Sequence, residues 1–177
     1  IIIGSILICM MVLSILGYSF LGGDKEEDKE KIIYNDFEFE KQNEFWITNI
    51  GSSLFIFKYN PTQVEEIEAD LKDLNDYYNK PLYISSENKE AESEIYRNLF
   101  YKNKIVQRMQ SACLREDICD KNLPVKTCED NFIVIKEANA SKIFQKENCV
   151  FIEGKQEDLT KISDEFLFRV VEIRAKQ

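Results

Sequence analysis

Residues 1–21 form an unbroken uncharged run, and this run constrains the chain more than any other feature. It contains no Asp, Glu, Lys or Arg, and a pair of glycines closes it. As a helix the run measures about 32 Å, close to the roughly 30 Å thickness of a bilayer's hydrocarbon core. A signal peptide is the alternative, but its apolar region spans only about 7–15 residues and ends in a small-residue cleavage site. Tyr18-Ser19-Phe20-Leu21 does not resemble such a site. The sequence therefore predicts a transmembrane anchor over residues 1–23.

The charge balance limits the partners of the remaining chain. The protein has 32 acidic and 23 basic residues, a formal net charge of −9. This excess argues against nucleic acid, whose phosphates need a basic face. It also argues against electrostatic attachment to anionic lipid, so the predicted membrane contact depends on the anchor alone. The acidity indicates either a surface for cations or basic partners or, more simply, a solvated surface.

The chain contains no histidine, which narrows the catalytic chemistry open to it. Ser-His and Cys-His nucleophiles and His-ligated zinc are excluded. An enzyme would have to use a thiol pair or carboxylates such as Glu153 or Asp164. Carboxylates on helices usually face solvent, and nothing in the sequence places two of them together. We therefore expect no enzyme, with no catalytic, cofactor-binding or metal-binding residues.

Four of the five cysteines lie close together in the second half of the chain, and the fifth, Cys9, lies within the apolar run. No Cys-x2-Cys pair occurs, which argues against a structural zinc site. An even number of clustered cysteines behind an anchor predicts two disulfides in an oxidising compartment. Three connectivities are possible, of which we favour Cys113–Cys119 with Cys128–Cys149. Four separate buried thiols are the alternative.

A glycosylation sequon, Asn139-Ala140-Ser141, indicates the same compartment. Such triplets also occur by chance. Together with the anchor and the cysteines, however, the sequon at Asn139 predicts a single-pass membrane protein whose C-terminal domain lies outside the cytoplasm.

The pattern beyond the anchor predicts a charged spacer over residues 24–32 and one α+β domain over residues 33–177. Residues 33–59 alternate as a three-stranded antiparallel meander with an aromatic inner face that includes Phe55 and Phe57. Strands are also expected over residues 82–85, 131–136 and 149–153, and residues 140–144 form either a helical turn or an edge strand. We expect one mixed sheet, covered by helices on one face.

Three helices are expected in this domain. A capping pattern at Asn60-Pro61-Thr62 begins a helix that reaches Tyr78. A longer helix begins at Asn88, carries Glu94 among its surface charges, and ends near Cys113. Residues 159–173 form an amphipathic closing helix.

Several short stretches resemble uncharacterised single-span, membrane-anchored surface proteins of archaea. They include Tyr34-Asn35-Asp36-Phe37-Glu38-Phe39, Tyr59-Asn60-Pro61, Leu82-Tyr83-Ile84-Ser85 and the stretch from Asn148 to Gly154. The resemblance implies an archaeal cell-surface setting, in which disulfides and a glycan are expected. It implies no activity.

Two functions fit these features. The first is an accessory or interaction subunit of a membrane or cell-surface complex, held in lipid by residues 1–23 and bound to a protein partner. The alternative is a pilin-like or surface-layer structural subunit whose N-terminal helix packs in an assembly, although the Glu found at the fifth mature position of bacterial pilins is missing.

Overall fold

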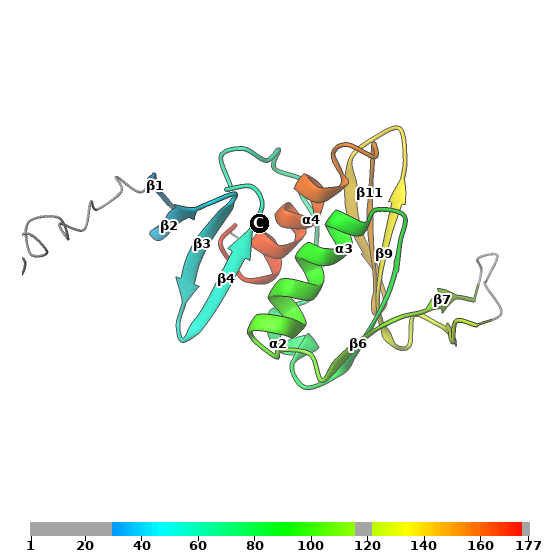
Figure 1. The fold of residues 1–177 in the computed structure, drawn as a ribbon. Coiled ribbons are helices and arrows are strands. Elements are labelled where there is room, and N and C mark those ends of the chain that lie inside the picture. The colour runs from blue at the N-terminus through cyan, green and yellow to red at the C-terminus, as the bar shows by residue number, and fades with distance from the viewer. Residues whose placement is uncertain (1–29, 116–121, 175–177) are drawn as a thin grey trace, which may run out of the picture.

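The computed structural model describes residues 30–115 and 122–174, which form two β-sheets with helices between them (Figure 1). The first sheet is an antiparallel meander in the order β1-β2-β3-β4. The second has the order β10-β11-β9-β5-β6, with β9 parallel to both β5 and β11. The meander comprises β1 (Lys31–Tyr34), β2 (Phe37–Gln42), β3 (Phe45–Ile50) and β4 (Ser53–Phe57). The second sheet comprises β5 (Pro81–Ser86), β6 (Arg108–Ser111), β9 (Asn131–Glu137), β10 (Lys142–Lys146) and β11 (Cys149–Gly154), and β7 (Cys113–Leu114) pairs separately with β8 (Val125–Lys126).

The predicted α+β class is confirmed, but the single mixed sheet is wrong. The amino-terminal meander forms a sheet of its own on the opposite side of the helices from the second sheet (Figure 1). It also has four strands rather than three, because Asn35 and Asp36 both adopt positive φ, 46° and 67°. Two such residues make the type of tight turn that joins paired strands. Residues 140–144 fall largely in edge strand β10, one of the two predicted alternatives.

Helix α4 (Leu159–Val170) lies at the centre of the domain, and it confirms the predicted closing helix. Both sheets pack on it, so that it is buried on nearly every side. The ring of Phe168 lies 4.6 Å from that of Phe57 and 6.2 Å from that of Phe39. The aromatic inner face predicted for the meander is therefore confirmed as its core side.

The helix predicted from Asn60 to Tyr78 is wrong, because only its end is helical, as α2 (Leu74–Tyr77). The preceding chain crosses the carboxyl end of α4, where side chains replace the hydrogen bonds of a helix. Arg174 Nη2 donates to the carbonyls of Pro61 at 3.0 Å and Val64 at 3.2 Å. Glu165 Oε1 accepts from the amide of Ile67 at 3.3 Å. A non-local partner thus overrides the local helical pattern.

The helix predicted from Asn88 to Cys113 is correct only in its first half. Asn88 caps α3 (Lys89–Ile95) through the amides of Glu90 and Ala91, and a π-helix, η1 (Tyr96–Lys102), continues it. Lys104 then adopts a φ of +48°, and the chain turns into β6. Strand β6 completes the edge of the second sheet by pairing in parallel with β5. The second half of the predicted helix is therefore decided by pairing with β5, which the local periodicity of the sequence does not indicate.

Two asparagines close the outer edge of β4: Asn98 within η1 and Asn103, the residue that ends it. Asn98 Oδ1 accepts from the amide of Ile56, and Asn98 Nδ2 donates to the carbonyl of the same residue, both at 2.8 Å. Asn103 makes the equivalent pair with Leu54, at 3.1 and 3.0 Å. Each carboxamide therefore replaces one residue of a missing neighbouring strand.

The π-helical geometry explains why both asparagines reach the same strand. In an α-helix, residues five apart are about 140° apart around the axis, whereas the i→i+5 repeat of a π-helix brings them onto one face. Asn98 and Asn103 are five apart. The Nδ2 of Asn103 also donates to the carbonyl of Asn98 at 3.1 Å. The widened helix thus aligns both amides with alternate residues of β4.

The predicted anchor, residues 1–23, and most of the predicted spacer, residues 24–32, lie outside the described residues. Strand β1 begins at Lys31, so the last two residues of that spacer belong to the meander. Among the described residues, no helix is both long and apolar enough to cross a bilayer.

We predict that Asn98→Ala lowers the free energy of unfolding by about 2–4 kcal/mol, since it leaves buried backbone groups of β4 without partners. Asn103→Ala, at a less buried position, costs about 1–2 kcal/mol. Urea denaturation measures both. Asn49→Ala, which removes an exposed amide from β3, serves as the control and leaves stability within about 0.5 kcal/mol. Equal effects at Asn98 and Asn49 contradict this role for η1.

Candidate functional site

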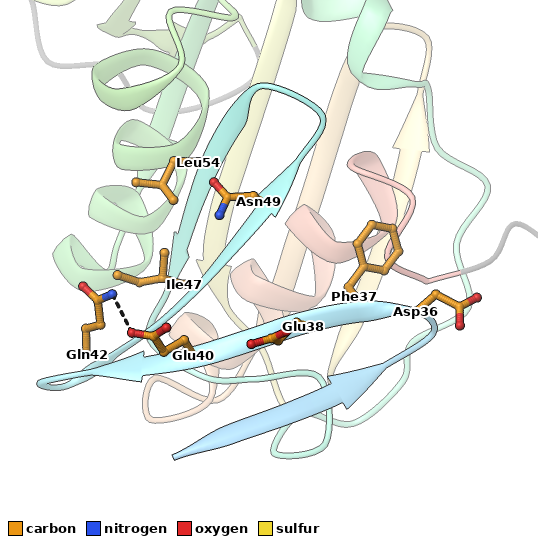
Figure 2. Close-up of a pocket in the computed structure, with 8 residues that line it drawn as sticks. All are labelled: Asp36, Phe37, Glu38, Glu40, Gln42, Ile47, Asn49 and Leu54. Carbon is orange, nitrogen blue, oxygen red and sulfur yellow. Dashed lines mark hydrogen bonds between the residues drawn. The ribbon is translucent and has the colours of Figure 1, made fainter. Parts of the chain in front are cut away.

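The outer face of the meander carries a hollow of about 350 Å³, which is our candidate binding surface (Figure 2). Alternation along the strands puts Phe39, Trp46 and Phe55 in the core and turns their neighbours outward. Ile47 of β3 and Leu54 of β4 supply apolar surface to the hollow. Its remaining lining comes from the β1–β2 turn, β2 and β3: Asp36, Phe37, Glu38, Glu40, Gln42 and Asn49.

The hollow is acidic and lacks a basic lining residue. Asp36, Glu38 and Glu40 contribute three carboxyl groups, and neither Lys nor Arg of the described chain lines it. Lys31 on β1 approaches from the side and pairs with Glu38 at 2.7 Å. Gln42 Nε2 donates to Glu40 Oε1 at 2.9 Å, as Figure 2 shows. The surface thus combines an apolar patch with excess negative charge, which suits a basic and partly apolar segment of a partner.

A second notable cluster is a pair of buried carboxyl groups, Glu94 on α3 and Asp164 on α4, both fully buried. Arg97 Nη1 donates to Glu94 Oε1 at 2.6 Å, and the amide of Tyr59 donates to Asp164 Oδ2 at 2.8 Å. Within residues 30–115 and 122–174, the other oxygen of each group has no donor. A proton held between these two oxygens satisfies both.

The electrostatics of the pair agree with a shared proton. Burial, followed by the negative charge of Glu94, raises the pKa of Asp164 well above its ordinary value of 3.8. Burial also raises the pKa of Glu94, although Arg97 opposes the shift. Two carboxyl groups in contact inside a protein cannot both ionise without a large cost. Asp164 is therefore the member that keeps its proton.

These positions correct two expectations from the sequence. Glu94 is not a surface charge, and the structure does place two carboxyl groups together. Asp164 lies on a helix whose neighbours Ser163 and Glu165 are also fully buried, which an amphipathic pattern does not predict. Glu153, the other carboxylate considered for catalysis, pairs with Lys136 at 3.2 Å on the second sheet. Neither Glu94 nor Asp164 lines the hollow on the outer face of the meander.

The disulfide predicted between Cys128 and Cys149 is confirmed. It ties the chain before β9 to the start of β11, beside a small cluster of buried side chains that includes Tyr83 and Phe132. Cys113 on β7 is also disulfide-bonded. Its predicted partner, Cys119, lies outside the described residues, so that pairing stays a prediction.

The sequon residue Asn139 lies exposed in the connection between β9 and β10. Ala140 and Ser141 are exposed as well, so the whole triplet is accessible from solvent. Glycosylation itself stays a prediction.

Comparisons with protein-family models, with curated proteins and with solved structures found no match to this chain. Function must therefore be argued from the surfaces described above.

We predict that Asp164→Asn stabilises the protein at neutral pH. The folded state holds a proton that the unfolded state releases above pH 3.8, so the wild-type protein loses stability as pH rises from about 4 through the raised pKa of Asp164. The carboxamide introduced by the substitution would donate to Glu94 without ionising, which removes this loss. Urea denaturation between about pH 4 and 8 measures the slope of the free energy of unfolding against pH.

Glu157→Gln is the matched control, because it neutralises an exposed carboxylate near the same helix. It leaves the pH slope unchanged. A D164N protein with the wild-type slope, or one destabilised at every pH, contradicts the shared proton.

We also predict that Cys128→Ser lowers the free energy of unfolding by about 2–4 kcal/mol, as expected for loss of a disulfide between residues 21 apart. Peptide mapping of the non-reduced protein should recover the linked Cys128 and Cys149 peptides. Alkylation of both thiols in the unreduced protein contradicts the bond.

Proposed function

We propose that this protein is a membrane-anchored, extracytoplasmic interaction subunit of a membrane or cell-surface complex. The observation that carries the proposal is the hollowed outer face of the meander. Its apolar surface at Ile47 and Leu54 lies beside three acidic side chains, on the opposite side of the sheet from the core. Interfaces commonly combine an apolar centre with a polar rim.

Three other features support this role. The uncharged run over residues 1–21 is long enough to anchor the chain. The Cys128–Cys149 disulfide suits an oxidising compartment. The exposed Asn139 sequon lies on the connection between β9 and β10, away from the lining of the hollow, so a glycan there would leave the acidic face open.

The outer face explains why we favour a basic partner. The hollow has three carboxyl groups and one neighbouring lysine, Lys31. A partner segment with Lys or Arg around an apolar side chain would find both complementary charge and an apolar contact there. Charge of this kind mainly increases the rate of association and the specificity.

Site-specific photo-crosslinking in native membranes tests the proposal. The full chain receives a benzophenone side chain at Asn49, which is exposed on β3 and lines the hollow. We expect one discrete crosslinked partner, identified by mass spectrometry. The same group at exposed Glu157 serves as the control and should capture none of it.

Charge reversal gives a second measure. Glu38→Lys combined with Glu40→Lys should reduce capture from Asn49 several-fold, because it removes the charge complementarity. Equal capture from the positions of Asn49 and Glu157 contradicts a specific interface. A regular ladder of crosslinked copies of the chain itself would instead indicate a pilin-like or surface-layer assembly.

A further inference from the structure

One stretch of this acidic protein carries only positive charge. Residues 95–115 include five basic residues and no Asp or Glu, although the whole chain has a net charge of −9. The basic residues are Arg97, Lys102, Lys104, Arg108 and Arg115. The first half of the stretch coincides with η1 and the turn that follows it. The overall acidity of the protein therefore does not describe this part of its surface.

The same π-helix presents aromatic rings to solvent. Tyr96 is 42% and Tyr101 63% exposed, and their rings lie 6.3 Å apart and nearly parallel, at 19°. Phe100 joins them, with its ring 5.4 Å from that of Tyr96. The two tyrosines are five residues apart, like the asparagines that close β4. The π-helical repeat thus aligns tyrosines outward as well as asparagines inward.

An open hollow of about 380 Å³ adjoins these rings. Tyr101 and Lys104 line this hollow. Beside it, the backbone N–H of Asn79 donates to the carbonyl of Ile105 at 2.7 Å and so links the two chain segments that form the hollow. The complete lining is Asn79, Phe100, Tyr101, Lys104, Val106 and Gln107. We call Tyr96, Phe100, Tyr101, Lys102 and Lys104 the basic–aromatic patch.

The lysines of the patch are available to an anionic partner. Lys102 and Lys104 are exposed, and no carboxylate of the described chain lies within ion-pair distance of either. The ammonium of Lys102 lies 5.6 Å from the ring centre of Tyr101. Lysine beside exposed tyrosine is the combination found where proteins meet lipid headgroups, because the rings enter the interface while the ammonium groups stay with the phosphates.

We propose that the basic–aromatic patch docks the domain on the anionic surface of the membrane that anchors it. The inference rests on the proposed anchor, because the seven residues from 24 to 30 can span at most about 25 Å between the bilayer and β1. Such a tether keeps the patch at high effective concentration near the lipid. The membrane contact would then involve the patch as well as the anchor. The net charge alone had indicated contact through the anchor only.

The patch lies close to the acidic face, because Asn103, between Lys102 and Lys104, bonds the backbone of Leu54, which lines the hollow. Anionic lipid attracts the acid-free patch and repels Asp36, Glu38 and Glu40. Lipid would therefore favour orientations of the domain in which the patch, and not the acidic hollow, contacts the headgroups. The closed edge of β4, which Asn98 and Asn103 occupy, argues against strand addition as the way a partner binds there.

Lysine acetylation of the full chain in nanodiscs tests the docking. One set of nanodiscs contains phosphatidylcholine alone, and the other contains phosphatidylcholine with phosphatidylglycerol. We expect the acetylation rates of Lys102 and Lys104 to fall several-fold in the anionic discs only, and to recover at high salt. The internal controls are two exposed lysines, Lys142 on β10 and Lys155 in the turn after β11. They should react at equal rates in both sets of nanodiscs.

A substitution separates the aromatic contribution. Tyr101→Ala should weaken the protection of Lys104 from acetylation several-fold. Because Tyr101 is exposed, we do not expect this substitution to disturb folding. Phe144→Ala, which removes another exposed ring from β10, is the matched control and should leave the protection intact. Circular dichroism confirms that both variants are folded.

The remaining outcomes are equally decisive. Equal or absent protection in the two lipids overturns the docking. Protection by soluble polyglutamate as strong as that by anionic lipid also overturns it, and assigns the patch to an acidic polypeptide. Failure of the chain to enter neutral nanodiscs refutes the anchor and with it the proposed function. The patch is then tested separately, by salt-sensitive binding of the same chain to anionic vesicles.

Discussion

The burial of α4 between two sheets governs how the polar groups of this domain are paired. A helix enclosed on both sides is usually apolar all round, whereas α4 carries Asp164, Glu165 and Arg169 into the interior. Buried charges must be paired. Glu165 therefore binds Arg169 at 3.0 Å and Arg174 at 2.8 Å. Arg174 in turn holds the carbonyls of the segment that follows the meander. The polar side of α4 thus fixes the path of the chain that would otherwise form a helix.

The π-helix η1 is the second organising element, because its repeat serves two surfaces at once. Inward, Asn98 and Asn103 complete the hydrogen bonds of β4 and join the meander to the helical layer. Outward, Tyr96 and Tyr101 form a stacked pair in solvent. A π-helix is rarer than an α-helix because its geometry is less favourable, and it often coincides with a functional site. In this protein, η1 has a structural role because it closes the edge of β4. Its exposed tyrosines form part of the basic–aromatic patch, for which we propose docking on lipid.

The two candidate surfaces differ in charge, and this difference connects the two proposals. The outer face of the meander concentrates carboxyl groups around apolar side chains, whereas the stretch over residues 95–115 contains no acid. A protein with a net charge of −9 can still present a positive surface, because a docking site depends on local charge within about a Debye length of 10 Å rather than on the total. The two surfaces adjoin at the edge of β4, where Asn103 bonds the backbone of Leu54.

Features that depend on neighbours along the chain were predictable from the amino-acid sequence. Alternation predicted the core side of the meander, the apolar repeat predicted α4, and the capping pattern at Asn88 placed the start of α3. Clustering of the cysteines predicted disulfides, but the favoured Cys128–Cys149 pair was one of three possible connectivities, and the tertiary structure decided it. Tertiary structure decided what depends on distant partners. Arg174 keeps residues 61–67 out of a helix, and β5 recruits Arg108–Ser111 as a strand. Helix α3 packs on α4, so that Glu94 and Asp164 meet in the interior. Local periodicity reports which side of an element is apolar, but it does not report how many layers will cover that element.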